Sequence, residues 1–120
     1  MMRDLGRHGE DLAEQHLVGQ GATVLARNYR LPVGEIDLVL LDDQDLVAVE
    51  VKTRVSNAVV QPEEAVTPRK LRRVARTLAM YAFNQGLFER HWRIDVVAIE
   101  VGADGSLLRL EHIPDAYESG

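Results

Sequence analysis

Two β-rich runs on either side of a short acidic stretch constrain this fold more than any other feature of the sequence. Residues 36–41 and 46–53 are rich in Ile, Leu and Val, and the residues between them, 42–45, are three aspartates and a glutamine. Polar residues of this kind favour turns between strands. We therefore predict an antiparallel hairpin in which the numbers of paired residues sum to 87.

This register sorts the side chains of the hairpin onto two faces, because side chains alternate along a strand. One face is predicted to be pure core and carries Ile36, Leu38, Leu40, Val47, Val49 and Val51. The other face carries four charged residues and then the apolar residues Val39, Leu41, Leu46 and Ala48. On this charged face Asp37 is expected opposite Glu50, and Glu35 opposite Lys52.

The rest of the chain supplies helices on either side of this hairpin and further strands. Apolar residues at helical spacing predict a helix over 4–19, and Thr67 followed by Pro68 predicts the start of a second helix that ends at Gly86. Strands are predicted over 24–29, 93–101 and 107–113, with a turn at 32–34 and a loop over 54–66. The order αβββαββ predicts an α/β fold, a mixed central sheet flanked by helices, in a single domain over residues 1–120.

Composition narrows the class of protein. The chain has 120 residues, 46% of them hydrophobic and none of them cysteine, and no apolar run is long enough to cross a membrane. Disulfides, thiol catalysis and cysteine zinc sites are excluded. We expect a soluble, cytoplasmic protein with no membrane partner.

Positive charge is concentrated in one segment of an acidic protein. The net charge of the chain is −5, yet residues 52–76 carry seven basic and two acidic side chains. On a helical wheel four arginines share one side of the second helix, and two further basic residues lie close to them in sequence: Arg69, Arg72, Arg73 and Arg76, with Arg54 and Lys70. This pattern predicts either a phosphate-contacting surface for nucleic acid or an ordinary solvated helix face.

The carboxylates predicted to lie opposite each other in the hairpin carry an electrostatic cost. Two unit charges about 4 Å apart at an effective dielectric constant near 20 repel by about 4 kcal/mol. A divalent cation would relieve the repulsion between Asp37 and Glu50, since Mg²⁺ binds one or two carboxylates and keeps several waters. The alternative is a charged sheet edge facing water, with Glu35 and Lys52 as a cross-strand ion pair.

These residues resemble a known nuclease site. Asp37 followed by Glu50-Val51-Lys52 resembles the D…(D/E)-x-K metal site of the restriction-endonuclease-like superfamily. More narrowly, several blocks in this order resemble the YraN family of bacterial proteins, usually described as uncharacterised or as predicted endonucleases. The blocks are Gly9-Glu10, Asn28-Tyr29-Arg30, Gly34-Glu35-Ile36-Asp37, Val49-Glu50-Val51-Lys52-Thr53-Arg54, Lys70 and Arg93-Ile94-Asp95-Val96-Val97.

The resemblance implies a restriction-endonuclease-like αβββαβ core and roles for individual residues. Asp37 and Glu50 would bind Mg²⁺ or Mn²⁺, with the carbonyl of Val51 as a further ligand, and Lys52 would orient or help to deprotonate the attacking water. Glu10 would occupy the place of the helix glutamate of archaeal Holliday-junction resolvases. Metal ions held in this way stabilise the charge that develops during phosphodiester hydrolysis.

Three further residues are candidates for a supporting role. Glu35 would tune Lys52 or contribute to a second site, and the sequence does not decide between these. Arg93 and Asp95 share a strand face and would either support the site or form a structural ion pair.

The leading hypothesis is a metal-dependent nuclease acting on DNA, with branched DNA as one candidate substrate. The alternatives are a nucleic-acid-binding module with an inactive site and a protein-interaction domain with a charged groove. A homodimer would supply the two sites that cutting two strands requires, but that rests on analogy with junction resolvases alone.

Overall fold

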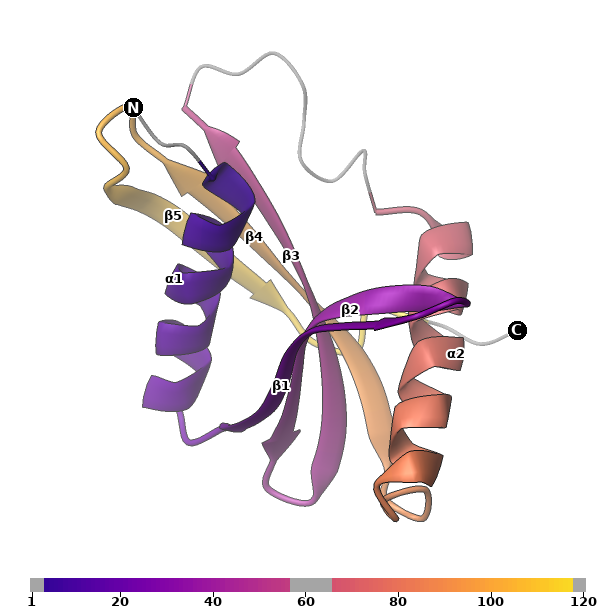
Figure 1. The fold of residues 1–120 in the computed structure, drawn as a ribbon. Helices are drawn as coiled ribbons and strands as arrows, with labels where there is room; N and C mark the ends of the chain where they lie inside the picture. Colours follow the sequence, from indigo (N-terminus) through magenta and orange to yellow (C-terminus); the bar gives the residue numbers. More distant parts are fainter. Residues whose placement is uncertain (1–3, 57–65, 118–120) are drawn as a thin grey trace.

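A computed structural model describes residues 4–56 and 66–117 of the chain, and it contains two helices and one five-stranded sheet within them (Figure 1). In chain order the elements are α1 (Leu5–Gly19), β1 (Thr23–Leu31), β2 (Gly34–Asp42), β3 (Asp45–Val55), α2 (Pro68–Asn84), β4 (Trp92–Val101) and β5 (Leu107–Ile113). The predicted αβββαββ order is therefore confirmed. Of the predicted loop over 54–66, residues 57–65 lie outside the described part of the chain.

The sheet is mixed, as the sequence predicts. Its strand order is β1-β2-β3-β4-β5, with β3 and β4 parallel and every other neighbouring pair antiparallel. Parallel neighbours need a crossover connection, and α2 lies on the chain between β3 and β4. The two helices cover opposite faces of the sheet, α1 on one and α2 on the other (Figure 1).

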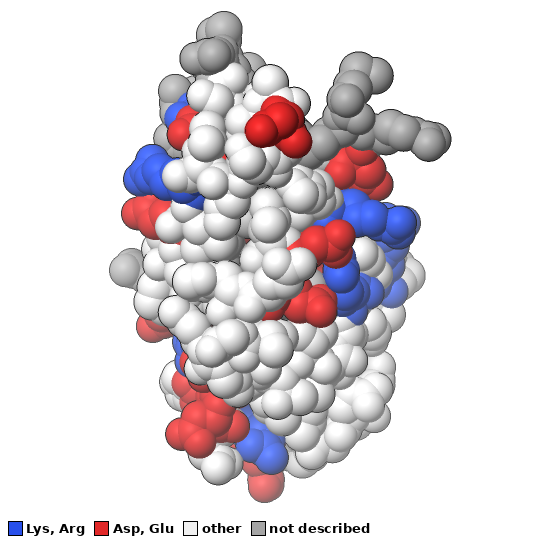
Figure 2. Space-filling model, turned by 90° about the vertical axis from the view of Figure 1, so that its left-hand side faces the viewer, with Lys and Arg blue, Asp and Glu red and all other residues white. Residues whose placement is uncertain are grey.

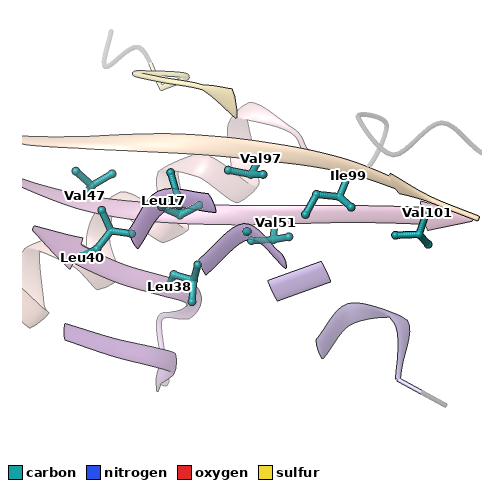
Figure 3. Close-up of a cluster of buried hydrophobic side chains, with 10 residues drawn as sticks. Leu17, Leu38, Leu40, Val47, Val51, Val97, Ile99 and Val101 are labelled. Carbon is teal, nitrogen blue, oxygen red and sulfur yellow. The ribbon is translucent and has the colours of Figure 1, made fainter. Parts of the chain in front are cut away.

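Each helix buries one face of the sheet. On the α1 side, Ala13 and Leu17 pack with valines, leucines and an isoleucine of β2, β3 and β4, several of which are drawn in Figure 3. On the α2 side, Leu71, Val74 and Leu78 pack with Val39, Leu46, Ala48 and Ile94 of the sheet. The apolar residues predicted to continue the charged face of the hairpin are thus covered by α2.

Local capping signals set where the helices begin. The Asp4 carboxylate accepts a hydrogen bond from the backbone N–H of Arg7, and the Thr67 hydroxyl accepts one from that of Lys70, at 3.0 and 3.1 Å. These bonds satisfy donors that the first turn of a helix leaves free, and Pro68 follows Thr67 at a position where no N–H is needed. In the part of the chain that the structure describes, neither helix is long and apolar enough to cross a membrane.

The register of the β2–β3 hairpin is the one predicted. Pairs run from Asp42 with Asp45 to Leu38 with Val49, and each pair sums to 87. The pairing of β2 with β3 ends at Leu38, while residues 34–37 of β2 stay paired with β1 as far as Leu31 with Gly34. The first part of β2, residues 34–37, therefore belongs to a two-stranded ribbon with β1 that turns towards α2 (Figure 1).

Because this ribbon twists away from β3, the predicted face of Ile36 is wrong. Strict alternation would place Ile36 with Leu38 on the α1 side, whereas it is fully buried in the cluster on the α2 side. Two-stranded ribbons twist more strongly than wide sheets, and Asn28, next to the partner of Ile36 in β1, has a left-handed φ of 50°. The extra twist rotates this end of the ribbon, so the face of Ile36 changes.

Candidate active site

Asp37 and Glu50 meet at the place where the backbone pairing of β2 with β3 ends, which we call the opening between the two strands. Asp37 Oδ2 accepts a hydrogen bond from the backbone N–H of Val51 at 2.8 Å, and the backbone N–H of Asp37 points to Glu50 Oε2 at 3.4 Å. The N–H and C=O of one residue point to the same side of a β-strand, so the carbonyl of Val51 lies on the same side as its N–H. Two carboxylates and a carbonyl are thereby directed to one opening.

Glu50 is the most deeply buried acidic side chain of this opening, with 2% of its surface exposed. Alternation from Ala48 places it on the α2 side of β3. Burial, and then the negative charge of Asp37, raises the pKa of Glu50 to about 8. Burial also raises the pKa of Asp37, against the hydrogen bond from Val51. Both carboxyl groups thus lie where a negative charge is costly.

Two lysines approach these carboxylates from different elements. Lys70, in the first turn of α2, places its Nζ 3.8 Å from Glu50 Oε1. Lys52 lies two residues along β3 from Glu50, and its pKa is lowered by burial first and by the neighbouring Lys70 second. Lys70 was predicted as part of the nucleic-acid surface, and the structure brings it to the carboxylates as well.

Glu10 reaches the same opening from the α1 side. Its carboxyl is half-buried, and burial and then the charge of Asp37 raise its pKa. The preceding residue makes the approach of α1 possible, because a Cβ at Gly9 would overlap the Thr53 hydroxyl of β3 and lie 2.8 Å from its Cβ. Glycine at this position lets the helix backbone lie directly against the strand.

The donor set fits a magnesium-like cation better than a zinc-like one. Within residues 4–56 and 66–117 no group of three or more His, Asp and Glu side chains is arranged to hold a metal ion. Mg²⁺ needs only one or two carboxylates together with carbonyl and water oxygens. A buried Glu50, whose cationic neighbour Lys70 stands at 3.8 Å, is a carboxylate that such an ion would stabilise.

The predicted pairing of Glu35 with Lys52 is wrong. Glu35 lies in the twisted ribbon, is exposed, and forms a 2.9 Å ion pair with Arg30 of β1. The ribbon has turned away from β3 at this point, so the cross-strand neighbour expected from the register is out of reach. Glu35 acts on the site from a distance, through its charge, which contributes to the raised pKa of Asp37.

Arg93 and Asp95 form a structural network rather than a support for the carboxylates. Both alternate with Ile94, which packs on the α2 side, so their side chains lie on the other face from Glu50. Arg93 binds Asp95, Asp42 and Asp45 at 2.7–3.0 Å and thereby ties β4 to the hairpin turn. Asp95 also bonds to His112 at 2.8 Å. Of the two interpretations, the ion pair is the one observed.

A basic groove of about 740 Å³ adjoins the site between α2 and the turn that joins β1 to β2. Its basic lining residues are Arg30, Arg69, Lys70 and Arg73. A Cβ at Gly34 in the wall would lie 2.9 Å from Thr77 Oγ1, so glycine allows this close contact with α2. The groove opens beside the carboxylates, because Lys70 contacts both.

Three of the six predicted nucleic-acid contacts line this groove. Arg69, Lys70 and Arg73 line the groove, whereas Arg72 and Arg76 are exposed on α2 outside that lining. Arg54 forms a 2.9 Å ion pair with Glu100 of β4 on the other side of Lys52.

Two residues near the site were not predicted. Asn28 forms a hydrogen bond with Glu10 that opposes the rise of its pKa, and Arg30 lines the groove. Both belong to the Asn28-Tyr29-Arg30 block, and an asparagine inside a β-rich run is the signal available in the sequence, since asparagine tolerates a left-handed φ.

The fold and the site together define a mixed α/β domain with an acidic and lysine-containing opening between two strands. Residues 9–99 match the model of the uncharacterised protein family UPF0102, and the chain belongs to this family. The YraN family is the same family, so the resemblance predicted from the motif blocks is confirmed.

Relatives from several bacteria cover almost the whole chain. The chain is 46% identical over 109 residues to a UPF0102 protein of Nocardioides sp. (strain ATCC BAA-499 / JS614), covering 91% of this chain and 87% of that protein. It is 42% identical over 117 residues to a UPF0102 protein of Syntrophomonas wolfei, covering 98% of this chain and all of that protein. A UPF0102 protein of Anaeromyxobacter dehalogenans is 46% identical over 114 residues, 95% of this chain and 84% of its own.

Proposed function

We propose that this protein is a metal-dependent nuclease that hydrolyses phosphodiester bonds of DNA. The observation that carries the proposal is the meeting of Asp37, Glu50 and Lys52 at the opening between β2 and β3. A basic groove beside the same opening gives a polyanionic substrate a place to bind.

Each residue has a chemical task in this proposal. Asp37, Glu50 and the Val51 carbonyl would hold Mg²⁺ or Mn²⁺. The ion, when bound, supplies positive charge for the attacking and leaving oxygens of the phosphodiester. Lys52 orients the attacking water, and its lowered pKa suits it to exchange a proton with that water. Lys70 adds a second positive charge between the carboxylates and the groove.

Glu10 completes the acidic environment in this proposal. It adds a third carboxyl close to Asp37 from the opposite side of the sheet, and its raised pKa reflects that proximity. Its task would be to hydrogen bond to water in the opening on the side away from α2.

Calorimetry and a cleavage assay test the proposal together. Wild-type protein should bind Mn²⁺ in the millimolar range or tighter, and Asp37→Asn and Glu50→Gln should each abolish the binding heat while the fold is retained. Lys52→Ala should keep the metal and lose cleavage of linear duplex, single-stranded, flap and junction DNA.

Two results would argue against the nuclease. A wild-type protein without metal binding would overturn it. Metal binding without cleavage of any substrate would favour a nucleic-acid-binding module instead. Glu89→Gln, which removes an exposed carboxylate beyond the far end of α2, is the matched control for the two ligand variants.

A further inference from the structure

A second cavity, of about 580 Å³, lies on the other side of Lys52 from the basic groove. Among the described residues, it lies between the start of α2 and the same faces of β3, β4 and β5. Its apolar lining includes residues at and just before the start of α2, in β4 and in β5: Val66, Pro68, Leu71, Val96, Ala98 and Ile113.

Polar groups of both signs surround this apolar floor. Arg54 pairs with Glu100 at 2.9 Å, and Arg109 pairs with Glu111 at 3.3 Å, all four of them lining the cavity. A cavity of this volume with an apolar floor and a few polar groups is typical of a site for an organic molecule. Side chains that donate and side chains that accept hydrogen bonds match the edge of a nucleobase, which carries both kinds of group.

The cavity and the basic groove meet at the lysine pair. Lys52 lines the cavity, Lys70 lines the groove, and the two lysines lie beside each other next to Glu50. A nucleic-acid strand with its phosphates in the groove would therefore bring a neighbouring nucleotide to the mouth of the cavity. A base paired in a duplex is stacked and cannot enter such a cavity, whereas an unpaired or flipped base can.

We propose that this cavity accepts the base of an unpaired nucleotide next to the phosphodiester at the carboxylates. The inference rests on the proposed function for its nucleic-acid substrate, and it names the substrate class: single-stranded DNA or branched DNA with an unpaired nucleotide at the site. Apolar contact with the base face and hydrogen bonds from the rim would supply the affinity.

Binding measured in EDTA, where hydrolysis cannot proceed, tests the inference. The probes are a fluorescein-labelled oligothymidine of about ten nucleotides and an abasic deoxyribose-phosphate strand of the same length and charge. Wild-type protein should bind the thymidine strand about tenfold more tightly, since contacts with single bases are worth factors of this size. Ala98→Leu, which fills the floor, should remove this preference and leave the affinity for the abasic strand unchanged.

Ala79→Leu is the matched control, because Ala79 is exposed on α2 and lines a different cavity. It should keep the tenfold preference. If Ala98→Leu does not fold, Ile113→Trp narrows the cavity from β5, where the side chain is 40% exposed and leaves room for a larger one.

Equal binding of both strands by wild-type protein, or a preference that survives in both filled variants, would overturn the inference. Cleavage of DNA with Mg²⁺ but without any preference for the thymidine strand would support the proposed nuclease function and overturn the proposal that the cavity binds a base. Preferential binding of the thymidine strand without cleavage of any DNA would support the base-binding cavity and argue against the proposed nuclease activity.

Discussion

Glu50 is held in a place where its charge is unfavourable, and this makes the site sensitive to pH. Its pKa of about 8 lies above the ordinary value of 4.5 because of burial and then because of Asp37. A raised carboxyl pKa means that the folded protein binds the proton more tightly than the unfolded chain does. This contribution to stability is complete below pH 4.5 and is lost as the pH rises to about 8.

Metal-free protein should therefore lose stability between pH 5 and pH 8, and Glu50→Gln should lose less. At pH 8 the variant is expected to be more stable than wild type by about 2 kcal/mol, since each pKa unit corresponds to about 1.4 kcal/mol and glutamine forfeits part of the hydrogen bonding. Part of the decline should remain in Glu50→Gln, because the pKa values of Asp37 and Glu10 are shifted in the same direction. Urea unfolding of both proteins at several pH values in EDTA measures their free energies of unfolding.

Glu89→Gln serves as the control for this measurement, since Glu89 is an exposed carboxylate beyond the far end of α2. It should follow the wild-type curve. Identical pH dependence in wild type and Glu50→Gln would show that Glu50 titrates as an ordinary glutamate and would contradict the burial argument.

The sequence predicted which acidic residues meet, but not how they meet. Side-chain alternation and strand register are local properties, so the proximity of Asp37 and Glu50 could be predicted from the residues of one hairpin. The contact of Lys70 with Glu50 joins residues twenty positions apart through the path of α2 over the sheet, and no local pattern encodes that path. The failure at Ile36 has the same origin, since the twist of the ribbon depends on where β3 stops pairing.

At the scale of elements, α1 depends on one residue for its contact with β3. Gly9 is buried and lies against Thr53, where a side chain would overlap the hydroxyl. Gly6, one turn earlier on the same helix, is exposed, and an added Cβ would approach nothing closer than 3.8 Å. Substitutions at the two glycines therefore allow the effect of helix packing on stability to be measured separately from the effect of intrinsic helix propensity.

Gly9→Ala should destabilise the protein by about 1–2 kcal/mol, because overpacking a tight contact costs more than alanine gains in helix propensity. Gly6→Ala should stabilise it by up to about 1 kcal/mol. Equilibrium unfolding in urea measures both, and Thr53→Ala in the Gly9→Ala background should recover part of the loss. A stabilising Gly9→Ala would mean that α1 does not lie against β3 in this way.

At the scale of the whole molecule, opposite faces of the sheet differ in character. Viewed from the α1 side, a broad area of the surface carries neither Lys or Arg nor Asp or Glu (Figure 2). The arginines of this side that the structure describes include Arg27, which is engaged by Glu10, Asp11 and Glu14 of α1. The basic groove is formed by α2 and the β1–β2 turn, where no carboxylate of the described residues forms an ion pair with Arg69 or Arg73. A net charge of −5 is thus compatible with local attraction of phosphates.

This distribution predicts that the location of a positive charge, and not only its number, controls affinity for DNA. Replacing Arg69 and Arg73 by glutamine should flatten the dependence of log affinity on log salt by about 1.5, since each lost phosphate contact changes the slope by about 0.7–0.9. The double variant Arg7→Gln and Arg90→Gln removes the same charge outside the groove and should leave the slope almost unchanged. Fluorescence anisotropy in EDTA over a series of salt concentrations gives both slopes, with thermal melts to confirm that Arg73, whose Nε lies 3.4 Å from the Val33 carbonyl, can be replaced without unfolding. An equal change of slope in the two double variants would show that the protein attracts DNA through its overall charge and not through the groove. A change of slope confined to the Arg69 and Arg73 variant would place the phosphates in the groove, beside Lys70 and the carboxylates.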